Sequence, residues 1–151
     1  MQSYKRILAP TDFSESGTQA VHTAAEFARK FHAELHVLHI VAPHVYYNEM
    51  PEMMMPPLED FTEELVASGN KRLESLAEEL GKDLRVFTHL EESIERPAAA
   101  ICRFANDLPA DLIVIGSHGH TGLMHVLLGA TAEHVVRRAG CTVLVTKPTE
   151  G

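Results

Sequence analysis

The feature that most constrains the fold is a short aliphatic run that ends at a glycine. Residues 112–115 are four consecutive aliphatic residues, so this run has no polar face to offer to water. Such a run predicts a fully buried strand, of the kind found in parallel sheets that are covered on both faces. Gly116 and Gly119 follow it, and we expect them to form a tight turn where a side chain would collide with a ligand.

The stretch after this glycine turn predicts an anion site. Residues 129–133 have the character of a helix start. A strand, a glycine turn and a helix N-terminus together allow close approach of a ligand, and the unpaired N–H groups of the first helical turn point at it.

The rest of the chain alternates between strand and helix patterns. The predicted strands are residues 6–10, 35–41, 84–90, 112–115 and 142–146, and the predicted helices are residues 14–32, 58–80, 97–108 and 131–139. In the last helix we expect the apolar side chains to face inward; these are Ala132, Val135, Val136 and Ala139. The alternation predicts an α/β fold, an open parallel five-stranded sheet with helices on both faces, of Rossmann-like type.

Residues 42–57 interrupt the alternation. Four prolines deny regular structure there, and a group of methionines lies among them: Met50, Met53, Met54 and Met55. We interpret the segment as a flexible excursion within a single domain, residues 1–151, and not as a second domain. The methionines could bind Cu(I) through soft thioethers. A hydrophobic lid or a partner-contact patch is the favoured interpretation, because methionine suits adaptable surfaces.

Charge and composition disfavour several classes of protein. The net charge of −8, from 13 Lys+Arg against 21 Asp+Glu, disfavours binding to nucleic acid and to anionic membranes. No apolar run is long enough to span a bilayer, and the first residues lack a signal-peptide core. The two cysteines, Cys102 and Cys141, suggest no disulfide framework and are most simply buried small residues. A cytoplasmic location is the simplest expectation.

In open parallel sheets, ligands bind at the carboxyl ends of the strands, where the winding direction reverses. With the strand order 3-2-1-4-5, the first and fourth strands flank this crevice. Their ends carry residues 10–12 and residues 116–119, the two most specialised turns of the chain. The order therefore predicts that these turns lie side by side.

Several segments together resemble the universal stress protein family. Residues 5–14 resemble its opening strand and turn, residues 38–40 the end of its second strand, and residues 141–146 its last strand. Residues 111–119 and 127–133 resemble its signature region. The resemblance covers essentially the whole chain except the methionine-proline excursion.

The resemblance implies a nucleotide site. One branch of the family binds nucleotide through a glycine, two residues, a glycine, nine residues, and a glycine before Ser or Thr; Gly116, Gly119 and Gly129 keep this spacing. It implies that Asp12 contacts the adenosine, that the main chain of Ile40 meets the adenine, and that the glycine segments hold ribose and phosphates. The implied ligand is ATP, ADP or AMP with Mg²⁺. The implied binding residues are Pro10, Thr11, Asp12, Ile40, Gly116, Ser117, His118, Gly119, His120, Gly122, Gly129, Ala130 and Thr131.

One position departs from the pattern. Ala130 stands where the pattern has Ser or Thr, so the hydroxyl that would bond a phosphate is absent. Losing one hydrogen bond to a charged group costs about 1.5–3 kcal/mol. Thr131 is one residue on and points about 100° away in a helix, so it is a poor substitute. We expect weakened ATP binding, with AMP and ADP less affected.

Plainer interpretations of the same residues stand beside these. The glycines could serve only a tight strand–helix connection, and Asp12 could be a turn residue. For Ser14, a helix-capping role is favoured over a role as a nucleophile. The ten histidines show no zinc spacing. The nearest approach to a histidine cluster lies in the glycine loop, at His118, His120 and His125, where solvent exposure is the simpler account.

Three functions remain in competition. The first is a small nucleotide-binding stress-response or regulatory protein. The second is a domain of the same type that binds no nucleotide and acts as an interaction or chaperone-like module, which Ala130 favours. The third is a slow ATPase, a self-phosphorylating protein or a nucleotidyl transferase, although the glycine loop shows no catalytic base. The family resemblance also implies a homodimer that pairs through residues 142–146, a short apolar strand at a sheet edge.

Overall fold

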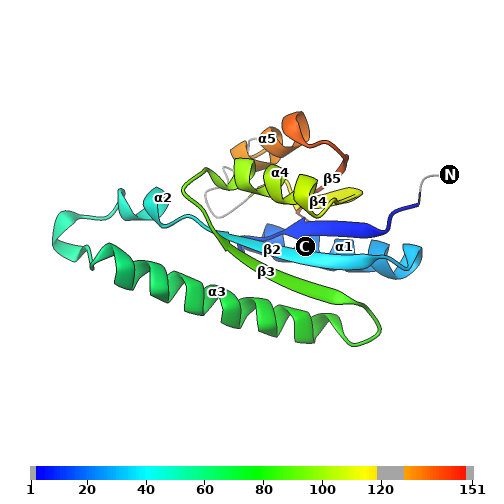
Figure 1. The fold of residues 1–151 in the computed structure, drawn as a ribbon, viewed down its shortest axis with the longest axis horizontal. Helices are drawn as coiled ribbons and strands as arrows, with labels where there is room; N and C mark the ends of the chain where they lie inside the picture. Colours follow the sequence, from blue (N-terminus) through cyan, green and yellow to red (C-terminus); the bar gives the residue numbers. More distant parts are fainter. Residues whose placement is uncertain (1–2, 119–127, 149–151) are drawn as a thin grey trace.

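A five-stranded parallel sheet lies at the centre of the fold, in the order β3-β2-β1-β4-β5 (Figure 1). The computed structural model describes residues 3–118 and 128–148. The predicted fold class and the predicted strand order 3-2-1-4-5 are confirmed. Each strand pairs in parallel with its neighbour, as the α/β alternation requires.

The elements have the following bounds. The strands are β1 Arg6–Pro10, β2 Glu34–Val41, β3 Val86–Glu92, β4 Leu112–Gly116 and β5 Thr142–Thr146. The helices are α1 Glu15–Phe31, α2 Pro43–Tyr47, α3 Leu58–Leu80, α4 Pro97–Asp107 and α5 Ala130–Arg138, with a 3₁₀ helix η1 at Glu52–Met54. No helix in the described ranges 3–118 and 128–148 is long and apolar enough to cross a bilayer.

The two faces of the sheet are buried against different helices. On β1, Ile7 and Ala9 pack with residues of α1 and α3, whereas Leu8 packs with residues of α4 and α5. The separation follows from the alternation of side chains along a strand. All three residues are fully buried, so β1 is the centre of the core.

Strand β3 lies two residues further along the chain than residues 84–90, the range predicted for it. Its register with β2 runs from Leu35 opposite Val86 to Val41 opposite Glu92. The last two residues of the strand, Glu91 and Glu92, are not hydrophobic. Pairing with β2 therefore sets the end of β3. Leu84 packs against the core although it lies in the preceding turn, which explains the error.

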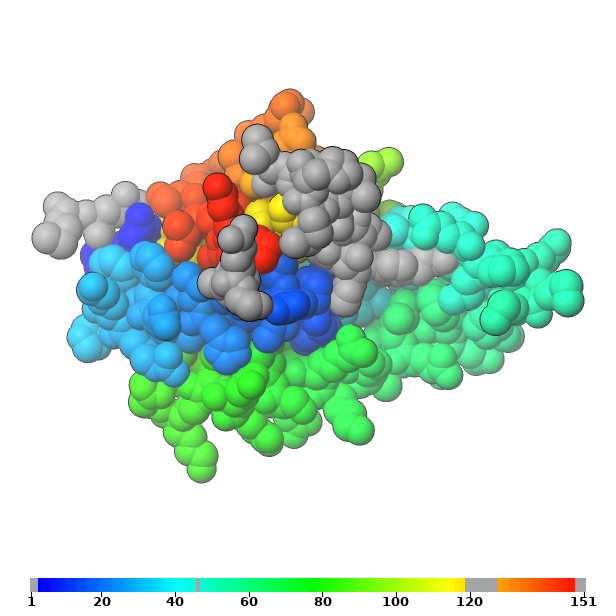
Figure 2. All heavy atoms as spheres, turned by 180° about the vertical axis from the view of Figure 1, so that it is seen from behind, coloured from blue at the N-terminus to red at the C-terminus, as the bar shows by residue number. Residues whose placement is uncertain are grey.

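The segment at residues 42–57 contains α2 and η1, so the prediction that its prolines deny regular structure is wrong. Pro43 is the first residue of α2, Pro51 immediately precedes η1 and Pro57 immediately precedes α3. Proline is tolerated at the start of a helix, because the N–H it lacks has no helical partner there. Figures 1 and 2 both show α2, η1 and the start of α3 projecting beyond the sheet.

The last helix, α5, differs from its prediction in two ways. It begins at Ala130, one residue earlier than predicted, with Gly129 as its N-cap. Ala132 and Val135 are buried as expected, but the Val136 side chain is 45% exposed. Val135 and Val136 are consecutive, so they lie about 100° apart around the helix and only one can face the sheet.

Candidate functional site

The carboxyl ends of β1 and β4 lie side by side, because these strands pair directly, with Ile7 opposite Leu112 and Leu8 opposite Ile113. The structure therefore brings together residues 10–12 and residues 116–118. Strand β2 runs further: Pro10, the last residue of β1, is opposite Leu38. Ile40 thus lies beyond the end of β1, at the rim of the crevice.

The turn after β1 is held by its own side chains. The Asp12 Oδ1 atom accepts hydrogen bonds from the Ser14 N–H, at 3.0 Å, and from the Ser14 hydroxyl, at 2.5 Å. The Ser14 Oγ atom in turn accepts from the Gly17 N–H at 3.1 Å, which caps α1. Ser14 is the predicted N-cap, and Asp12 has the turn role that was its plainer interpretation. This role uses the Oδ1 atom of the carboxylate. Contact between Asp12 and a nucleotide stays a prediction.

Phe13 has a backbone conformation that non-glycine residues rarely adopt, with φ of 63°. Its ring contacts hold it in place. The His39 ring centroid lies 4.5 Å away, and the Arg72 guanidinium carbon lies 5.6 Å from the ring centroid. Backbone strain of this kind persists where surrounding contacts impose it, and it is common at functional sites.

Gly116 is the last residue of β4 and not part of a turn, which corrects the prediction. A Cβ atom there would lie 2.6 Å from the Ser16 Oγ atom and 2.9 Å from the Ser16 carbonyl oxygen. The first turn of α1 therefore requires a glycine here, because a backbone carbonyl cannot move aside. Close packing of a helix on a strand is by itself sufficient to require glycine at position 116.

The start of α5 is joined directly to the end of β4. The Gly129 N–H donates to the Ser117 carbonyl at 2.6 Å, and a Cβ atom on Gly129 would lie 3.0 Å from that oxygen. Ala130 and Thr131 are exposed. Their N–H groups have no hydrogen-bond partner within residues 3–118 and 128–148. These N–H groups and the helix dipole make this end of α5 attractive to an anion.

Two buried hydroxyls beside Gly116 were missed by motif reasoning. The Ser16 Oγ and Thr146 Oγ1 atoms are buried without a hydrogen-bond partner in the described part of the chain. Ser16 lies against Gly116, and Thr146 is opposite Gly116 in the β4–β5 register. Neither belongs to a sequence motif, since only the fold brings α1 and β5 to the same glycine.

The remaining predicted binding residues are only partly placed. Ser117 is 1% exposed, and its hydroxyl lies 2.8 Å from the Nδ1 atom of the half-buried His118. Gly119, His120 and Gly122 lie outside the described residues, as does His125. Within the described ranges, no group of three or more His, Cys, Asp or Glu side chains could hold a metal ion.

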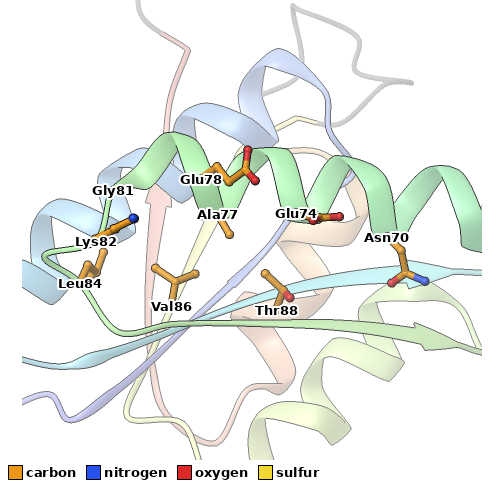
Figure 3. Close-up of a pocket in the computed structure, with 9 residues that line it drawn as sticks. All are labelled: Asn70, Glu74, Ala77, Glu78, Gly81, Lys82, Leu84, Val86 and Thr88. Carbon is orange, nitrogen blue, oxygen red and sulfur yellow. The ribbon is translucent and has the colours of Figure 1, made fainter.

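A cavity of about 750 Å³ lies elsewhere, between α3 and β3. Figure 3 shows Ala77 on α3 facing Val86 and Thr88 on β3 across it. Its lining includes the carboxylates of Glu74 and Glu78, which would repel a phosphate. None of the predicted nucleotide-binding residues lines it, so it is separate from the crevice at β1 and β4.

The two cysteines, predicted to be buried small residues, are partly buried. Burial raises the pKa of the Cys102 thiol, and burial followed by the nearby Asp111 carboxylate raises the pKa of the Cys141 thiol. A raised pKa lowers the fraction of reactive thiolate. Neither cysteine therefore has the character of a nucleophile.

The chain is similar to known proteins over nearly its whole length. The model of the Universal stress protein family matches residues 3–147. Universal stress protein MJ0531 of Methanocaldococcus jannaschii is 35% identical over 144 residues, which cover 95% of this chain and 82% of that protein. The family resemblance of the sequence is thereby confirmed.

Solved structures support the same conclusion for the fold. The universal stress protein UspA from Lactobacillus plantarum superposes with a TM-score of 0.76 at 26% identity, over 96% of this chain and 99% of that one. A universal stress protein from Archaeoglobus fulgidus, solved in complex with dAMP, superposes with a TM-score of 0.66 at 21% identity, over 95% and 98%. At that identity the likeness shows a shared fold.

Proposed function

The chain belongs to the universal stress protein family, and from this premise we propose that it binds an adenine nucleotide in the crevice at the ends of β1 and β4. In this proposal the protein is regulatory: nucleotide binding changes its conformation or its choice of partner. The dAMP complex of the Archaeoglobus fulgidus protein supports the ligand class.

One observation carries the proposal. The Gly129 N–H donates to the Ser117 carbonyl at 2.6 Å, which fixes the start of α5 at the end of β4, beside the turn after β1. The exposed N–H groups of Ala130 and Thr131 suit phosphate oxygens. Ile40, beyond the end of β1, suits contact with the adenine through its main chain.

The finer parts of the proposal concern ligand, metal and assembly. The proposed ligand is ATP with Mg²⁺, or ADP or AMP, and the protein acts in the cytoplasm as a homodimer paired through β5. Ala130 supplies no hydroxyl to a phosphate, so we expect AMP and ADP to be less affected than ATP. The same residue favours a second candidate, a nucleotide-free interaction module.

The test is native mass spectrometry of the freshly purified protein, followed by thermal unfolding with AMP, ADP and Mg-ATP at millimolar concentration. We expect a bound nucleotide or a rise of a few degrees in the unfolding midpoint, because a ligand at 100 times its Kd adds about 2.7 kcal/mol to stability. In Ala130→Ser, the restored hydroxyl should tighten Mg-ATP binding about tenfold or more, since a hydrogen bond to a charged group contributes about 1.5–3 kcal/mol.

Ala130→Val is the matched control, because it adds bulk at the same exposed position without a hydroxyl. It should not tighten binding. If neither the wild-type protein nor Ala130→Ser is stabilised by any of the three nucleotides, the nucleotide proposal is wrong and the interaction module replaces it.

A further inference from the structure

His39 lies where three parts of the fold meet. It belongs to β2, next to Ile40, and its Nδ1 atom is 2.9 Å from the Thr11 carbonyl oxygen in the turn after β1. Its ring lies against the Phe13 ring, with 4.5 Å between centroids. The side chain thus contacts both ends of the strained turn that contains Asp12.

The hydrogen bond to Thr11 fixes the tautomer of His39. A carbonyl oxygen can only accept, so the proton must lie on Nδ1. Protonation of the ring at low pH would leave this N–H in place. The Thr11 N–H meanwhile donates to the Leu38 carbonyl at 2.8 Å, so the two peptide groups of Thr11 are both bonded to β2.

Helix α3 closes the other side of the His39 ring. A Cβ atom on Gly69 would lie 3.0 Å from the His39 Cδ2 atom and 2.7 Å from the Leu90 Cδ1 atom. Glycine inside a helix is unfavourable, so a packing requirement explains its presence here. The ring thus lies between α3 and the turn after β1.

The shape of the turn is maintained locally, but its position relative to β2 depends on contacts with other elements. Phe13 is held in the left-handed region, at φ of 63°, although it carries a side chain. The bonds within the turn, from the Phe13 N–H to the Thr11 hydroxyl and from Ser14 to Asp12, fix its chain path locally. Contacts from His39 to Thr11 and Phe13 hold the turn in position relative to β2.

We propose that His39 is a positioning residue for the nucleotide site: through its Nδ1–H, it holds the Thr11–Phe13 turn against β2 so that Asp12 and Ile40 face one ligand together. This rests on the proposed function, because the ligand is the proposed nucleotide. Because Gly69 of α3 packs against the His39 ring, the position of α3 also affects the position of this turn.

Three substitutions separate the hydrogen bond from simple packing. In His39→Asn the side-chain amide lies where Nδ1 lies in histidine, so the bond to Thr11 is retained. In His39→Gln the amide reaches toward the Nε2 position, and the bond is lost although a polar group remains. His39→Leu places an apolar side chain at this position and supplies no hydrogen-bond donor.

The first measurement needs no nucleotide. Nitrogen NMR of the wild-type ring should show the proton on Nδ1. The amide resonances of Thr11, Phe13 and Ser14 should shift more in the Gln and Leu variants than in the Asn variant, since all three variants lose the ring and only Asn retains the hydrogen bond. An Nε2-protonated ring, or turn resonances unchanged in His39→Leu, would overturn the proposal.

The second measurement is the Kd for AMP. We expect a loss of roughly fivefold to tenfold in the Leu and Gln variants, about the value of one neutral hydrogen bond, and a change below about twofold in the Asn variant. Equal losses in all three variants would overturn the proposal. If wild-type protein binds no AMP, the proposed function fails, and the NMR comparison alone decides whether His39 positions the turn.

Discussion

His36 and His89 form a hydrogen-bonded pair between β2 and β3. The His36 Nδ1 atom lies 2.9 Å from the His89 Nε2 atom, and the His36 Nε2 atom lies 3.0 Å from the Glu34 Oε2 atom. The carboxylate accepts, so His36 carries a proton on Nε2. One further proton can be shared between the rings, but two would place two N–H groups against each other. This arrangement agrees with the lowered pKa of His89, which burial and then the charge of His36 cause.

This pair predicts a loss of stability in acid. Burial, and then the charge of His36, lower the pKa of His89 below its ordinary value of 6.5. The unfolded chain therefore binds more protons there, so this stability is present above pH 6.5 and is lost as pH falls toward the lowered pKa. We expect the temperature of the unfolding midpoint to be lower at pH 5.5 than at pH 7.5. In His89→Gln this decrease should be smaller.

The comparison between variants isolates this pair from other groups. Glu34, Arg6 and Arg85 form the charged surroundings of His36, and all three are unchanged in His89→Gln. His22→Gln is the matched control, because it removes a half-exposed histidine that pairs with Glu79 at 3.5 Å and belongs to α1, not to β2 or β3. It should keep the loss of stability in acid that the wild type shows. Identical pH profiles for wild type and His89→Gln would contradict the prediction.

At this scale the sequence predicted local roles well and tertiary roles poorly. Ser14 was predicted as a cap because capping depends on its immediate neighbours. Gly116 was misread, because the atom that excludes a Cβ there belongs to Ser16, far away in the sequence. His39 carried no local signal, since its partners Thr11 and Gly69 come from two other elements.

At the scale of elements, β5 is an edge strand of the sheet. It pairs only with β4 within the described part of the chain and has no charged residue. The Thr146 carbonyl accepts from the Ser117 N–H, so the backbone of Thr146 faces β4. Alternation along a parallel strand then directs the N–H groups of Val143 and Val145 outward, where a second chain could pair with them.

The proposed homodimer can be tested at this edge. Val145→Pro removes an outward N–H while it leaves the bonds to β4 intact and keeps an apolar side chain. We expect the wild type to sediment as a dimer at micromolar concentration and Val145→Pro as a folded monomer, judged by far-UV circular dichroism. Val145→Thr retains the N–H and should remain a dimer. A monomeric wild type, or a dimeric proline variant, would refute pairing through β5.

Most elements could be predicted from the sequence, because their periodicity is strong and their caps are local. Helices α1 and α3 have the predicted bounds to within one residue, from Ser14 to His32 and from Leu58 to Leu80. Strand β3 and the segment at residues 42–57 could not be predicted as well. The end of β3 depends on its partner strand, and the prolines mark helix starts instead of breaks.

At the scale of the whole molecule, protection should decrease from the centre of the sheet to its edges. Strand β1 is paired on both sides, and Ile7, Leu8 and Ala9 are fully buried. Strand β3 is paired on one side only. We expect hydrogen exchange, followed by mass spectrometry, to be slowest in β1 and β4 and faster in β3. Exchange in β3 as slow as in β1 would contradict this order.

The contact between Gly129 and Ser117 has a consequence for variation and engineering. The chain leaves the sheet at Ser117 and returns to the same carbonyl at Gly129, through a bond of 2.6 Å. Residues 117 and 129 are thereby joined to each other. We expect β4 and α5 to keep their mutual placement when residues between these two anchors are exchanged.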